Sequence, residues 1–89
     1  MSAEVVLDVS ELEAPEPLMR TLAAAETLGP GQYLRMLHRR FPCLLQENLE
    51  KRGFACAIVE QGDVVTSYIW RVSEQELIPA HIRHPGLPQ

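Results

Sequence analysis

The fold of this chain is decided by the stretch Leu7-Asp8-Val9-Ser10-Glu11-Leu12-Glu13-Ala14-Pro15-Glu16-Pro17. Its first part belongs to residues 4–9, where polar and apolar residues alternate, and this alternation predicts a strand. Its last part contains Pro-x-Pro, which suits the first turn of a helix because the missing proline N–H would have no partner there. The stretch therefore predicts a strand that passes through an acidic turn into a helix.

Working outward, the chain repeats this alternation of strand and helix. Glycine ends both expected helices, at Gly29-Pro30-Gly31 and at Gly53, and Gly62 suits a tight hairpin. The expected strands are residues 4–9, 32–38, 54–60 and 64–72, and the expected helices are residues 15–28 and 42–52.

The predicted order is thus β-α-β-α-β-β, which belongs to the α+β class. Helical crossovers should make the first three strands parallel, and the hairpin adds an antiparallel strand. We expect a two-layer α/β sandwich with a four-stranded mixed sheet and two helices on one face. Residues 1–72 form this domain, and residues 73–89, with three prolines and few apolar residues, predict a mobile tail after a possible short helical turn.

Composition limits the classes of function. The chain has 89 residues and a net charge of −4, so it lacks the basic balance of a general nucleic-acid-binding protein. No apolar run approaches the roughly 20 residues that span a bilayer, and no basic segment precedes an apolar one at the N-terminus. We therefore expect no membrane association and a cytoplasmic location. Cys43 and Cys56 follow neither a metal nor a disulfide spacing, which predicts reduced, packed thiols.

The sheet face away from the helices is expected to be partly apolar. Residues 54–59 are apolar on both faces of their strand, and residues 68–70 nearly so. Either small residues are tolerated in solvent, or a protein partner or a homodimer covers this face.

The junction at Ala14, Pro15 and Pro17 resembles that of the TusA/SirA-like sulfur carriers, which read Cys-Pro-x-Pro and carry a persulfide on the thiol. Here alanine replaces the cysteine, so the resemblance implies the fold but not sulfur transfer at this position. The resemblance covers residues 5–72.

A second stretch narrows the resemblance. His38, Pro42 and the Gly53-Phe54 pair look like those of one uncharacterised TusA-like subfamily that lacks the carrier cysteine. Relatives occur beside hemerythrin-like cation-binding domains or in respiratory and denitrification settings, which implies a metal, redox or respiratory context. The subfamily usually has an aspartate after the histidine, where this chain has Arg39.

Ligands of α/β folds gather at the carboxyl ends of parallel strands, here at residues 11–17 and 38–43. His38 could bind a metal or titrate near neutral pH, or it could make one structural hydrogen bond. A metal would need further ligands, for which the candidates are Glu11, Glu13 and Glu16.

Arg39 and Arg40 favour the opposite charge, because they precede an expected helix N-terminus and could help to bind an anion. They could equally form a solvated cluster paired with the acids of the first loop. Cys43 lies in the first turn of that helix, where a thiol pKa is lowered, so a relocated sulfur carrier is a further hypothesis.

The leading hypothesis is a non-catalytic TusA-like binding or adaptor domain that acts through the strand-end loops or the open sheet face. The alternatives are a small-ligand or metal-binding domain centred on His38 and a sulfur carrier that uses Cys43. The sequence predicts no catalytic residue and identifies no cofactor, ligand or partner.

Overall fold

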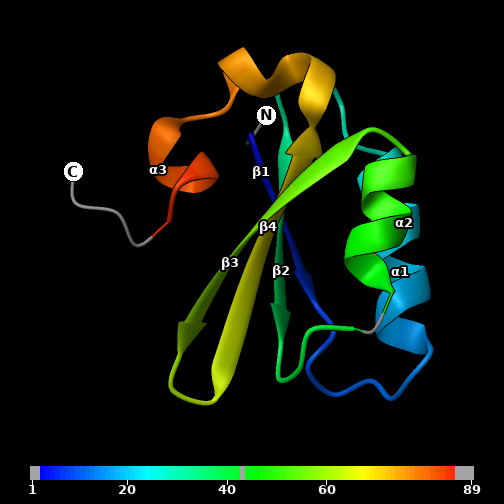
Figure 1. The fold of residues 1–89 in the computed structure, drawn as a ribbon. Helices are drawn as coiled ribbons and strands as arrows, with labels where there is room; N and C mark the ends of the chain where they lie inside the picture. Colours follow the sequence, from blue (N-terminus) through cyan, green and yellow to red (C-terminus); the bar gives the residue numbers. More distant parts are fainter. Residues whose placement is uncertain (1–2, 43, 86–89) are drawn as a thin grey trace.

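The computed structural model describes residues 3–42 and 44–85. Within them the chain forms a four-stranded sheet, two helices on one face of it and a short helical segment after the last strand (Figure 1). The elements are β1 (Glu4–Asp8), α1 (Glu16–Glu26), β2 (Tyr33–His38), α2 (Leu45–Lys51), β3 (Phe54–Gln61), β4 (Val64–Arg71), the 3₁₀ helix η1 (Val72–Leu77) and α3 (Ala80–Arg83).

The strands lie in the order β1-β2-β4-β3. β1 runs parallel to β2, and β4 lies antiparallel between β2 and β3, so the first three strands point the same way. The predicted α+β sandwich with a mixed sheet is confirmed.

The main core lies between the sheet and the helices α1 and α2. Alternate residues of β2 and β4 point toward the helices, because successive side chains of a strand face opposite sides. Their fully buried side chains meet Leu45 and Leu49 of α2, whose spacing of four residues places both on one helix face. The buried members from the strands are Leu34, Met36, Phe54 and Ile69.

Both helices start later than the sequence suggested. α1 begins at Glu16 rather than at residue 15, and its N-terminal cap, Pro15, offers no side-chain hydrogen bond. α2 begins at Leu45 rather than at residue 42, because Leu44 before it has a left-handed backbone with φ 70° that cannot belong to the helix.

The segment after β4 differs from the expected mobile tail. Residues 72–83, which we call the C-terminal segment, form η1 and α3 on the side of the sheet opposite α1 and α2 (Figure 1). Ile78 and Ile82 are 2% and 3% exposed and pack against Tyr33 and Trp70. Ile78 lies in the extended link after η1 and Ile82 lies in α3, so no helical spacing in the sequence marks the two as one buried pair.

The second face of the sheet is therefore not open along its whole length. Ala55, Ala57 and Tyr68 complete the cluster beneath the C-terminal segment. Glu74 fastens the segment by accepting a hydrogen bond of 3.0 Å from the backbone N–H of Gly31. The division of the chain at residue 72 stays a prediction.

No helix in residues 3–42 and 44–85 is long and apolar enough to cross a membrane.

Candidate functional site

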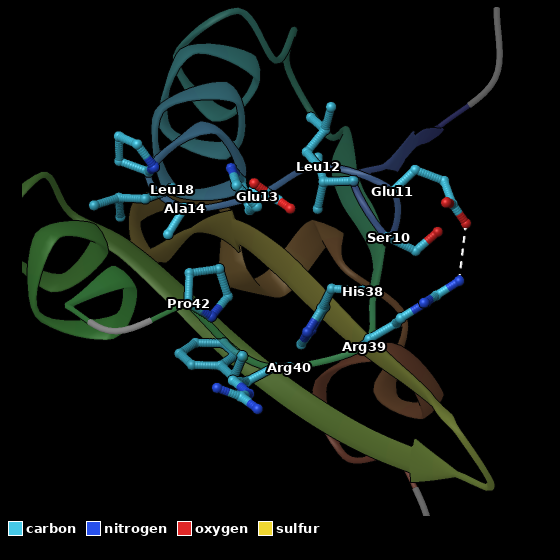
Figure 2. A pocket seen from close by; sticks show the side chains of 14 residues that line it. Ser10, Glu11, Leu12, Glu13, Ala14, Leu18, His38, Arg39, Arg40 and Pro42 are labelled. Carbon is cyan, nitrogen blue, oxygen red and sulfur yellow. Dashed lines mark hydrogen bonds and ion pairs between the residues drawn. The ribbon is translucent and has the colours of Figure 1, made fainter.

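Two loops at the carboxyl ends of β1 and β2 enclose a pocket. β1 and β2 are parallel neighbours, with Asp8 opposite Leu37, so the loops that follow them lie side by side. The space between them measures about 740 Å³ (Figure 2). The lining residues that the sequence analysis named are Glu11, Glu13, Ala14, Pro15, Pro17, His38, Arg39, Arg40 and Pro42.

Ala14 is exposed and lies on the wall of this pocket, opposite the loop of Pro42 (Figure 2). A cis peptide bond joins it to Pro15, and α1 starts immediately afterwards. The alanine methyl group offers neither a nucleophile nor a hydrogen-bonding group. The wall thus has the backbone of a strand-to-helix junction without a reactive side chain.

His38 is the last residue of β2 and is 2% exposed. Its Nε2 and the hydroxyl of Ser67 on β4 share a hydrogen bond of 2.8 Å, and its ring meets Phe41 edge to face at 5.7 Å. Nδ1 is buried without a hydrogen bond of ordinary geometry. Burial lowers the pKa of His38, although the nearby backbone of Arg40 acts in the opposite direction. His38 is therefore a neutral imidazole that lines the pocket and is hydrogen-bonded to β4 of the sheet.

The carboxylates proposed as metal ligands do not gather around His38. Glu11 pairs with Arg39 at 3.0 Å, and Glu16 pairs with Arg20 at 3.3 Å and lies outside the pocket lining. Within the described part of the chain, no three His, Cys, Asp or Glu side chains are placed to hold a metal ion. The geometry gives the metal hypothesis no ligand set among these residues.

The two arginines of the second loop differ in their surroundings. Arg39 is neutralised by Glu11 across the mouth of the pocket (Figure 2). Arg40 is exposed at the pocket edge, and its side chain has no ion pair within residues 3–42 and 44–85. Arg39 is therefore paired with an acid of the first loop, as one of the two interpretations of this basic cluster predicted, whereas Arg40 is not.

The two cysteines have different outcomes. Cys43 lies outside the described residues, so the hypothesis of a relocated sulfur carrier stays untested. Cys56 is half-buried on β3, and burial raises the pKa of its thiol to about 11 against the opposing effect of a hydrogen bond with Ser67. At neutral pH it is a protonated, packed thiol, as expected.

Sequence reasoning missed Ser67 as part of the site. This residue is completely buried and links His38 on β2 to Cys56 on β3. The sequence does mark Ser67, as a hydroxyl side chain between Val65 and Ile69 on the apolar face of a strand. Its partners could not be predicted, because they depend on which strands lie beside β4 in the sheet.

The sequence profile of an uncharacterised conserved protein family, DUF2249, matches residues 6–72. The chain belongs to this family. The match includes both loops of the pocket and ends at the start of the C-terminal segment.

The DUF2249 domain is also similar to a solved structure. The crystal structure of a SirA-like protein from Desulfitobacterium hafniense aligns with a TM-score of 0.58 and 20% sequence identity, over 72% of this chain and 92% of that one. At this identity the likeness concerns the fold, and it confirms the TusA/SirA-like architecture. No curated protein is significantly similar in sequence to this DUF2249 protein.

Proposed function

We propose that this DUF2249 protein is a non-catalytic binding domain that holds its ligand between the β1–α1 and β2–α2 loops. The observation that carries the proposal is the pocket of about 740 Å³ at the carboxyl ends of two parallel strands. Small-molecule pockets occupy roughly 300–1,000 Å³ and favour this end of α/β sheets.

The chemistry of the lining supports binding rather than catalysis. Ala14 takes the place at which the related carriers have a thiol. The hydroxyl of Ser10 donates to the carboxylate of Asp8 at 2.6 Å, and Nε2 of His38 is occupied by Ser67. Among the described lining residues, no hydroxyl or thiol is therefore hydrogen-bonded to a histidine, the base that most often activates such a nucleophile.

The second face of the sheet supports the same choice. One of the two expectations for this face was a protein partner or a homodimer, but Ile78 and Ile82 of the C-terminal segment cover Trp70 and its neighbours. The pocket between the two loops is a concave surface that the described residues leave free. A cytoplasmic location and a redox or respiratory setting belong to this proposal and rest on the sequence alone.

The test is to fill the pocket. Ala14→Trp places an indole on the pocket wall, and Ala23→Trp places the same group on the exposed surface of α1, outside the pocket. Native mass spectrometry of the untagged protein, followed by ligand-detected NMR with a small-molecule library, should find ligands that wild type and Ala23→Trp bind and Ala14→Trp does not. Ligands that bind equally to both variants would place the function elsewhere on the surface.

A further inference from the structure

The pocket has one unpaired charge of each sign. Arg39 and Glu11 neutralise each other at 3.0 Å. The side chains of Glu13, on the first loop, and Arg40, on the second, make no hydrogen bond or ion pair with each other or with any other described residue. Figure 2 shows them on opposite loops of the pocket.

The isolation of Arg40 is unusual for this chain. Acids outnumber lysine and arginine by 12 to 8, so most basic side chains find a partner. Of the lysines and arginines in the described residues, Arg40 alone lacks an ion pair or a hydrogen bond to a carbonyl. The others have Glu or backbone carbonyl partners. Among the described residues, the one lysine or arginine side chain without such a partner thus lies at the candidate site.

Apolar side chains separate the two free charges. Leu12 and Leu18 line the pocket on the side of Glu13, and Phe41 and Pro42 line it on the side of Arg40. A ligand with a purely apolar body would bury this lining but leave both charges unpaired. A simple carboxylate would pair with Arg40 and add a negative charge near Glu13, and a simple amine would do the reverse.

We infer that the ligand is a zwitterion with an aliphatic body, such as a short apolar peptide or an amino-acid-like molecule. Its carboxylate pairs with the guanidinium of Arg40, its ammonium group pairs with Glu13, and its body contacts the apolar lining. This inference rests on the proposed function, because it names the ligand class of the same pocket. Free small zwitterions and the ends of a partner chain share this chemistry, and blocked peptides distinguish them.

The experiment titrates the protein with leucyl-leucine, its N-acetyl derivative, its C-terminal amide and the doubly blocked form, monitored by chemical shifts of the pocket residues. We expect the free dipeptide to bind about 3- to 5-fold more tightly than either singly blocked form, the effect of one exposed charge pair. Arg40→Gln should abolish the preference for the acid over the amide, and Glu13→Gln the preference for the amine over the acetylated form. Arg20→Gln and Glu76→Gln, exposed and outside the pocket, should change neither.

Several results would overturn the inference. Equal binding of all four forms, blocked by Ala14→Trp, would leave the pocket as a binding site and refute the zwitterion. An N-acetyl derivative that binds as tightly as the free dipeptide would assign a carboxylate alone, as at the C-terminus of a partner. The converse result with the amide would assign an amine alone. Absence of binding by every form would refute the ligand class, while the library screen with Ala14→Trp judges the pocket independently.

Discussion

Truncating Ile78 or Ile82 to alanine should release the C-terminal segment from the sheet while the four strands, α1 and α2 stay folded. These two side chains are 2% and 3% exposed and are the buried residues of the segment. Neither η1 nor α3 has a side-chain N-cap, so the helices of the segment contribute little independent stability.

The size of the effect follows from the buried carbon. Each Ile→Ala change removes three carbon groups, at about 0.8 kcal/mol for each buried group. The equilibrium between the C-terminal segment packed on the sheet and the segment released from it should shift by about 2.4 kcal/mol, or about 50-fold, toward the released state. The free energy of unfolding of the remaining domain should change little, because the main core lies on the other face of the sheet.

Trp70 provides the assay. It is the single tryptophan of the chain, is 4% exposed and lies directly beneath Ile78 and Ile82. Release of the C-terminal segment should expose the indole of Trp70, shift its fluorescence emission to the red and allow iodide to quench it. The far-UV circular dichroism should keep the signal of the sheet, α1 and α2.

Leu77→Ala is the matched control, because Leu77 belongs to the same segment but is 63% exposed. Its emission should equal that of wild type. Unchanged Trp70 emission in both isoleucine variants would refute the packing argument. Cooperative loss of all secondary structure would refute the claim that the C-terminal segment can leave the sheet while the rest of the domain stays folded.

Three further predictions concern the titration of His38, the titration of Cys56 and the hydrogen bond that links Arg71 to Leu28. Because burial lowers the pKa of His38, the unfolded chain takes up a proton near pH 6.5 that the folded chain does not. The free energy of unfolding should therefore fall as the pH drops below about 6.5, a dependence that urea titrations should find reduced in His38→Phe and intact in the exposed control His81→Gln. The thiol pKa of Cys56 rises from 9.0 to about 11, so an alkylating agent at pH 7.5 should label it only through unfolding. Above pH 9 the unfolded thiol ionises first, and the chain should lose up to about 2.7 kcal/mol near pH 11; rapid native labelling would contradict this. Arg71 donates a hydrogen bond of 2.6 Å to the carbonyl of Leu28 after α1, so Arg71→Met should cost about 1.5 kcal/mol in denaturant unfolding, whereas Arg20→Met should be nearly neutral.

Local patterns were sufficient to predict the elements. Alternation identified the strands, and the glycines at positions 53 and 62 both have positive φ, at the end of α2 and in the hairpin. These are the places where an L side chain would be strained. The helix bounds and the segment after β4 differed: α1 ends at Glu26 rather than at residue 28, α2 starts late because Leu44 has a backbone angle that the sequence did not reveal, and η1 and α3 replace the expected mobile tail.

The order of the strands was beyond local pattern. A hairpin can place β4 at the edge of a sheet or between two earlier strands, and the latter arrangement brings Ser67 beside His38. The second cluster was hidden for a similar reason, because Ile78 and Ile82 find Tyr33 and Trp70 only across the folded sheet.

The candidate site was predicted as a neighbourhood rather than as a set of contacts. Two loops at the ends of parallel neighbours must approach each other, which places Ala14 and His38 on one pocket. The direction of each charged side chain depends on local geometry. Glu16 lies one helical turn before Arg20 on α1 and forms an ion pair with it, so its carboxylate does not take the expected place beside His38 as a metal ligand.

Ser67 has one proton to donate and two neighbours, the buried His38 and the half-buried Cys56. When it donates to Nε2 of His38, the neutral imidazole must carry its own proton on Nδ1. When it donates to a Cys56 thiolate instead, Nε2 must hold the proton and Nδ1 becomes a bare acceptor. Ionising a sulfur on the edge strand would thus switch the tautomer at the floor of the pocket, with no movement of the backbone.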